Sequence, residues 1–134
     1  MSAAAPEDAD RLESIRMIRD SAAAVAPPGG DLRRVRALRF TDPGFDPAVL
    51  RQMGELGWIG LRVPEEAGGA GLGMGEMCAL AEQLGAGLVP EPLIHAALSA
   101  ALLAAARERA LLARVLSGDV LVLTAWQERA DTLD

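Results

Sequence analysis

The sequence predicts a mainly α-helical fold, a bundle of about five or six helices with one strand segment at its C-terminal end. Ala and Leu dominate a composition that is 51% hydrophobic, and both residues favour helices. Apolar residues recur at helical spacing along most of the chain, and clusters of glycine and proline separate these stretches. A chain of 134 residues is long enough to bury a core without a disulfide or a metal.

Three helices are predicted in the first half of the chain. The first begins at Pro6 and carries an apolar stripe as far as Val25, and the Pro-Pro-Gly-Gly run at 27–30 ends it. A short helix over 32–38 follows. The third is expected over 46–57, from an aspartate cap and a proline at the first helical position to a glycine that suits the left-handed conformation.

The second half predicts a glycine-rich loop over 58–73 and then helices over 75–84, 93–107 and 110–116. The loop glycines lack GxGxxG spacing between a strand and a helix, so we interpret the loop as a compact connection that lets two helices pack closely. The helix over 93–107 is apolar on nearly every side, and we expect it to be buried on most faces. The run 120–126 is strand-like, and a lone strand is not stable, so any sheet it joins must come from elsewhere.

Charge and hydropathy exclude several functions. The chain has 13 basic and 19 acidic residues and a net charge of −6, so we expect no nucleic-acid partner. The longest apolar run, 93–106, is shorter than the ~18 residues of a membrane span and contains His95 and Ser99, so we expect no membrane partner. No secretory signal is visible and the single Cys78 cannot form an internal disulfide, which predicts a cytoplasmic location.

The residues by themselves predict no catalytic group and no metal site. His95 is the only histidine, and the nearest acid along its helix is Glu91, across a proline, so we interpret His95 as a core or edge residue. Cys78 is expected to be an inert buried thiol. One histidine and one cysteine cannot build a structural zinc site, and the carboxylates are scattered along the chain.

Four stretches resemble one known family. The run 54–73, GELGWIGLRVPEEAGGAGLG, resembles the LGW-GL-VPEE-GG-GLG signature of the N-terminal domain of the acyl-CoA dehydrogenase family. Residues 82–85 resemble the EELG helix end of that domain, and 89–93 resemble the P-P-L start of its next helix. Residues 117–128 resemble the passage into the middle β domain. The matches follow one another in order over nearly the whole chain.

The resemblance implies a flavoenzyme with an N-terminal helical domain, a middle β domain and a C-terminal helical bundle. Such an enzyme removes the α and β hydrogens of an acyl-CoA thioester, with FAD as cofactor and an electron-transfer flavoprotein as redox partner. We expect residues 1–118 to form the helical domain and 119–134 to begin the middle β domain. In the family the catalytic base and most flavin contacts come from other regions and from a neighbouring subunit. No catalytic residue is therefore assigned, a homo- or hetero-oligomer is expected, and FAD binding by this chain alone should be weak or absent.

The same resemblance places candidate flavin contacts in the strand-like run. Thr124, Trp126 and Gln127 fall where the family's strand meets the flavin ring. Gln127 stands where the family has a threonine whose hydroxyl bonds the flavin, and an amide can donate a similar hydrogen bond. The run 129–133 departs from the family's Pro-Gly-Ala-Gly-Ser stretch, which leaves the pyrophosphate contact of this segment without its usual residues.

Candidate substrate-pocket residues lie on the most apolar helix. The helices over 75–107 resemble the part of the domain that walls the acyl pocket in the family. Ala97, Ala101 and Ala104 follow at about one-turn spacing and would leave room for a bulky acyl group. Close helix packing explains the same alanines equally well, so both interpretations stay open at this point.

Two functional hypotheses follow. In the first, the chain is the N-terminal part of an FAD-dependent acyl-CoA dehydrogenase that walls the acyl pocket and is inactive in isolation. In the alternative, it is a non-catalytic helical interaction module that docks onto a partner supplying the β domain. An exposed strand edge predicts self-association of the isolated chain.

Overall fold

The computed structural model describes residues 6–26, 29 and 32–125. Within these residues the chain forms six α-helices, one short 3-10 helix and no strand, so the predicted mainly helical fold is confirmed. The elements are α1 (Pro6–Val25), α2 (Leu32–Leu38), α3 (Pro47–Glu55), η1 (Glu65–Ala67), α4 (Met74–Ala86), α5 (Leu93–Ala105) and α6 (Arg109–Leu116).

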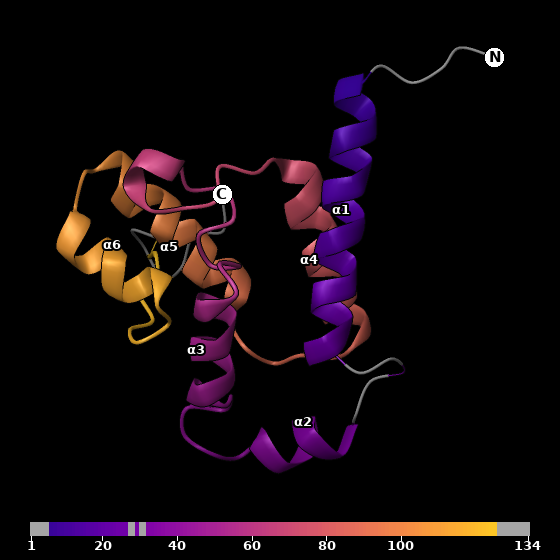
Figure 1. Ribbon diagram of the computed structural model, residues 1–134. Coiled ribbons are helices and arrows are strands. Elements are labelled where there is room, and N and C mark those ends of the chain that lie inside the picture. The colour runs from indigo at the N-terminus through magenta and orange to yellow at the C-terminus, as the bar shows by residue number, and fades with distance from the viewer. Residues whose placement is uncertain (1–5, 27–28, 30–31, 126–134) are drawn as a thin grey trace, which may run out of the picture.

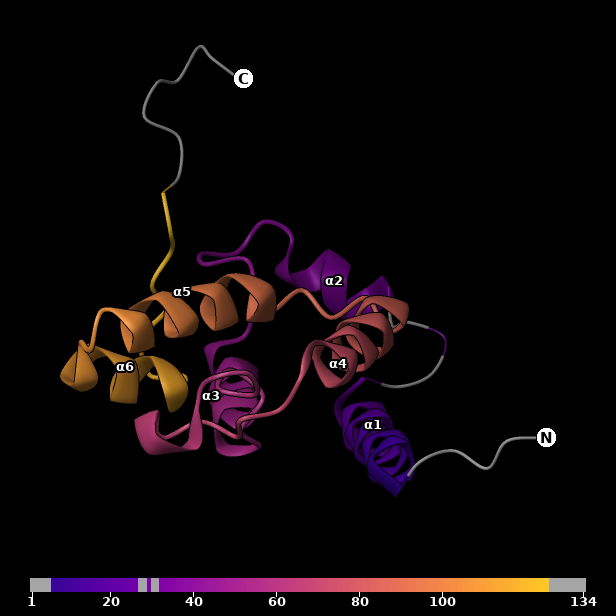
Figure 2. The same ribbon diagram turned by 90° about the horizontal axis from the view of Figure 1, so that it is seen from above.

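The helices form two packed pairs with α3 beside them. Helix α1 lies along α4, and α5 lies beside α6 (Figure 1). Figure 2 shows α4 between α1 and the pair formed by α5 and α6. The N-terminal turns of α1 extend beyond α4 (Figure 1), and Leu12 is 63% exposed there, whereas Ala22 and Ala26 at the other end of α1 are fully buried.

Local chemistry fixes both ends of α3 as the sequence predicts. The Asp46 Oδ1 atom accepts a hydrogen bond from the backbone N–H of Ala48 at 2.9 Å, and Pro47 occupies the first helical position. At the other end Gly57 has a φ of +74°, the left-handed conformation that ends many helices and that glycine adopts without strain.

The start of the glycine-rich run, 58–63, lies at the centre of the core. A Cβ at Gly60 would lie 2.7 Å from Cδ2 of Leu116 on α6, so the Leu116 side chain would have to move to admit one. The structure thus agrees with the interpretation of this run as a connection that permits close packing. Four residues of the run have 2% or less of their surface exposed: Trp58, Ile59, Leu61 and Val63.

Two helical glycines allow a matched test of this close packing. A Cβ at Gly54 in α3 would lie 2.5 Å from the carbonyl carbon of Ser117, whereas a Cβ at Gly85 in α4 would meet nothing within 4 Å. We expect Gly54→Ala to lower the free energy of unfolding by about 1–3 kcal/mol through overpacking. Gly85→Ala should raise it by about 0.5–1 kcal/mol because alanine favours helices. Urea titrations measure both, and stabilisation by Gly54→Ala would show that α3 and the end of α6 are not in contact.

Helix α5 is less buried than the sequence predicts. One side of it packs in the core, with Leu93, Ala96 and Ala100 at most 2% exposed. The opposite side carries apolar residues that solvent reaches, Ile94 (52%), Leu98 (44%) and Leu102 (48%), because no described element covers that side. Although α5 is the most apolar helix, none of the helices in the described parts of the chain is long and apolar enough to span a membrane.

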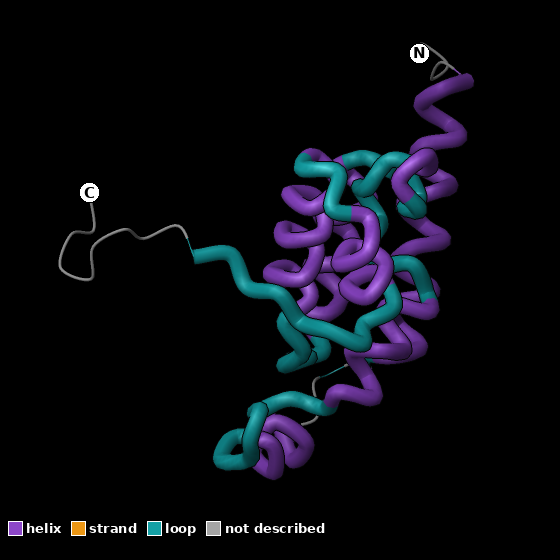
Figure 3. Tube along the Cα trace, turned by 90° about the vertical axis from the view of Figure 1, so that its left-hand side faces the viewer, coloured by secondary structure: helices purple, strands orange, loops and turns teal. Residues whose placement is uncertain are grey.

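The predicted strand is not formed in its described part. Residues 120–125 are neither helix nor strand, since the described chain holds no second strand to pair with, and they leave the helices as a loop (Figure 3). Just before them, Asp119 accepts hydrogen bonds from Arg51 at 3.1 Å and from Ser117 at 3.0 Å, and these bonds lower the pKa of the Asp119 carboxyl group. The contacts tie the turn after α6 to α3.

Candidate functional site

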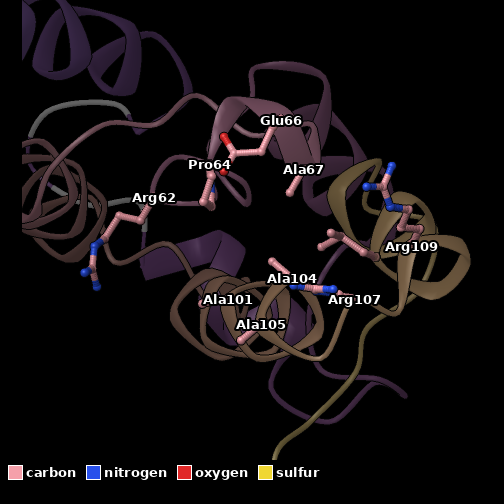
Figure 4. Close-up of a pocket in the computed structure, with 10 residues that line it drawn as sticks. Arg62, Pro64, Glu66, Ala67, Ala101, Ala104, Ala105, Arg107 and Arg109 are labelled. Carbon is pink, nitrogen blue, oxygen red and sulfur yellow. The ribbon is translucent and has the colours of Figure 1, made fainter.

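Two adjoining pockets lie against α5. The first has a volume of about 570 Å³, and Figure 4 shows Ala67 of η1 and Ala104 of α5 facing each other across it. Its lining comprises Arg62, Pro64, Glu66, Ala67, Ala101, Ala104, Ala105, Arg107, Arg109 and Leu112. The second, of about 350 Å³, lies between α4, α5 and the core run. Its lining comprises Ile59, Arg62, Val63, Met74, Met77, Cys78, Ala81, Ile94, Ala97, Leu98 and Ala101.

All the substrate-pocket residues predicted from the sequence border these cavities. Ala97 lines the second pocket, Ala104 lines the first, and Ala101 lines both. Ala97 and Ala104 are half-buried and also pack against the core cluster, and Ala101 is exposed. The structure thus brings the three together on one side of α5.

The two pockets differ in polarity. The lining of the first includes three arginines, Arg62, Arg107 and Arg109, and the acidic Glu66. The lining of the second is aliphatic or sulfur-containing apart from Arg62. Cys78, expected to be a buried thiol, is exposed and lines this second pocket, because the face of α4 that carries it is not covered by a described element. An apolar cavity with few polar groups is the usual form of a small-molecule site.

Of the predicted flavin contacts, only Thr124 lies within the described residues. Its Oγ1 is 3.0 Å from Oγ of Ser99, a buried residue of α5, and the two hydroxyl groups share a hydrogen bond. A hydroxyl group offers one donor and two acceptor positions, so Thr124 keeps the capacity for a further bond. Trp126 and Gln127 lie outside the described residues. Thr124 is therefore the one predicted flavin contact whose surroundings the structure describes.

A buried ion pair holds the start of α5 in place. The side chain of Glu91, two residues before α5, is fully buried and pairs with Arg34 of α2, whose Nη1 donates at 3.1 Å. The backbone N–H of Asp46 donates to the same carboxylate at 3.1 Å. The hydrogen bond to Glu91, with its negative charge, raises the pKa of Arg34 above its usual value.

Sequence reasoning did not find this pair, although an acidic residue between two prolines was a signal that Glu91 has a structural role. Glu91 is engaged by Arg34 and Asp46, and His95 is exposed, which leaves His95 without the acidic partner considered for it. Among the described residues no group of His, Cys, Asp and Glu side chains could hold a metal ion.

Comparison with known proteins identifies the family. Residues 12–119 match the acyl-CoA dehydrogenase N-terminal domain. Acyl-CoA dehydrogenase IpdE2 of Mycobacterium tuberculosis is 36% identical over 97 residues, which are 71% of this chain and 30% of that protein. Benzylmalonyl-CoA dehydrogenase of Aromatoleum aromaticum is 36% identical over 76 residues, which are 53% of this chain and 18% of that protein.

A solved structure agrees with these matches. A variant of the Tcur3481–Tcur3483 steroid ACAD is similar with a TM-score of 0.73 and 29% identity, over 84% of this chain and 32% of that one. The chain thus spans less than a third of the length of each of these proteins. Since the family match covers most of its residues and the helical fold is the same, the chain belongs to the acyl-CoA dehydrogenase family, with residues 12–119 as its N-terminal domain.

Proposed function

We propose that this chain is the N-terminal part of an FAD-dependent acyl-CoA dehydrogenase and that α5 walls its acyl pocket. The observation that carries the proposal is the apolar second pocket, where Ala97 and Ala101 leave space between α5 and α4. Its volume of about 350 Å³ is within the range of small-molecule sites. The exposed Ile94 and Leu98 on its rim give an acyl chain an apolar surface to cover.

The residues of α4 and α5 that line the second pocket bind the acyl chain and exclude water from it. Bound FAD supplies the hydride acceptor for α,β-dehydrogenation of the thioester. The α4–α5 wall holds the acyl chain so that its α and β carbons stay in one position, which is the requirement for coupled loss of a proton and a hydride. The proposed flavin contacts are Thr124, Trp126 and Gln127. The middle β domain is proposed to begin at residue 119. The complete enzyme is proposed to be a homo- or hetero-oligomer that reduces an electron-transfer flavoprotein.

A bulky residue in the wall tests the proposal. We expect Ala101→Trp to weaken binding of hexanoyl-CoA to the 134-residue chain by roughly tenfold or more, since an indole at this position would fill space in both pockets. Ala23→Trp, an equally large change at an exposed alanine of α1, should leave binding unchanged. Isothermal titration calorimetry measures both. Equal affinities for the wild-type chain and both variants would contradict an acyl site on α5.

The isolated chain is expected to be inactive. A dye-coupled dehydrogenase assay with a panel of acyl-CoA thioesters should show no turnover, because the base and most flavin contacts are proposed to lie elsewhere. Turnover together with a yellow flavin spectrum would overturn this expectation.

The alternative of an interaction module is favoured by the uncovered apolar face of α5, with Ile94, Leu98 and Leu102. It predicts a stable complex with a second polypeptide and no thioester binding by the chain. A clean monomer in size-exclusion chromatography that still binds hexanoyl-CoA would exclude it.

A further inference from the structure

Arg62 brings a single charged side chain to an otherwise apolar pocket. All the other lining residues of the second pocket are aliphatic, methionine or cysteine. We infer that this pocket takes an acyl group that carries a free carboxylate at the end remote from the thioester, and that Arg62 recognises this carboxylate. The inference rests on the proposed function and names its substrate class.

The position of Arg62 is fixed by its neighbours in the core. Leu61 and Val63 on either side are 2% and 1% exposed, and the Leu61 carbonyl accepts a hydrogen bond from the backbone N–H of Leu72 at 2.8 Å. The backbone of Arg62 is therefore held between two buried side chains while its own side chain stays exposed. The anchored backbone fixes where the Arg62 side chain begins, and the exposed side chain loses rotamer freedom when it binds a ligand.

The guanidinium group of Arg62 is available for a ligand. Glu65 and Glu66 follow three and four residues later, yet Arg62 forms no ion pair with either of them or with any other residue in the described chain. Although Arg62 lines both pockets, Figure 4 shows its guanidinium group directed away from the first. In the second pocket Arg62 is the one charged residue of the lining.

The chemistry of this pocket favours a ligand with an apolar body and one anionic group. The aliphatic walls offer no partner for polar groups along the ligand, and burying such groups there would cost free energy. The planar guanidinium group matches a carboxylate with two parallel hydrogen bonds. Because Arg62 is exposed, solvent screens the pair, and the gain in affinity is that of a surface ion pair rather than a buried one.

A pair of thioesters of equal length tests the inference. Adipyl-CoA and hexanoyl-CoA both have six acyl carbons, and only adipyl-CoA ends in a carboxylate. We expect the 134-residue chain to bind adipyl-CoA roughly fivefold more tightly at low ionic strength, and the preference to fall as salt is added. Arg62→Met, which keeps an unbranched apolar stem, should abolish the preference, so that this variant binds the two thioesters with equal affinity. Arg109→Met, in the first pocket, should retain the preference.

The outcomes separate this inference from the proposed function. If the wild-type chain binds both thioesters equally and Ala101→Trp binds neither, the role of Arg62 is overturned and the acyl site is supported. An equal loss of both thioesters in Arg62→Met shows that Arg62 binds a phosphate of CoA and overturns the carboxylate assignment. Binding of neither thioester contradicts the acyl site and this inference together. Circular dichroism of Arg62→Met confirms that the helices are intact before affinities are compared.

Discussion

Arg34→Met is expected to lower the free energy of unfolding by about 3–5 kcal/mol, because it leaves a buried carboxylate without its cation. The Glu91 side chain is fully buried, and with Arg34 removed the one remaining donor to it among the described residues would be the backbone N–H of Asp46, at 3.1 Å. Methionine preserves much of the apolar stem of arginine, so the loss measured is chiefly that of the charge. Urea denaturation at neutral pH gives the value.

An exposed pair of the same residue types provides the control. Arg19 of α1 and Glu82 of α4 are 2.6 Å apart, but their side chains are 52% and 70% exposed. Arg19→Met should therefore change stability by less than about 1 kcal/mol. If Arg34→Met and Arg19→Met lower the free energy of unfolding by the same amount, the burial of Glu91 does not explain the stability that Arg34 contributes.

Much of the helical fold could be predicted because its signals are local. The cap at Asp46, the left-handed Gly57 and the proline before α5 each act within a few residues, and all correspond to observed helix ends. The pairing of Arg34 with Glu91 joins residues 57 apart in the sequence, and no periodicity carries that information. Tertiary contacts of this kind can be found only when the helices are placed.

The burial of α5 and Cys78 could not be predicted for a related reason. An all-apolar helix indicates that its faces favour burial, but it does not show whether this chain supplies the covering element. In the structure the side with Ile94 and Leu98 is uncovered and borders a pocket. A helix that lines a ligand site and a helix that is buried in a core therefore have the same apolar sequence pattern.

The candidate site was predicted in part. The spacing of Ala97, Ala101 and Ala104 indicated one side of one helix, and the structure places that side at the pockets. Arg62 was not singled out, since its role depends on the meeting of the 58–63 run with α5. The available signal was a charged residue between Leu61 and Val63, both apolar, in a strongly apolar run.

Trp58→Ala is expected to lower the free energy of unfolding by about 3–5 kcal/mol, the usual cost of removing a buried aromatic side chain. Trp58 is 1% exposed and lies in the core cluster with Met53, Ile59 and Leu80. Its backbone N–H donates to the carbonyl of Met53 at 3.0 Å, so the residue also joins the end of α3 to the core run. Since the run from Trp58 leads directly to Arg62, loss of this anchor should also weaken adipyl-CoA binding in any molecules that remain folded.

A second aromatic residue supplies the contrast. Phe40 is 85% exposed. The guanidinium group of Arg39 lies 4.8 Å from the centroid of its ring, and this is the one cation–π contact in the described residues. Phe40→Ala should therefore cost less than about 1 kcal/mol. Thermal unfolding followed by circular dichroism compares the two variants. A small loss for Trp58→Ala would mean that the core can close around the missing indole, and Trp58 would then not be what fixes the position of Arg62 beside the pocket.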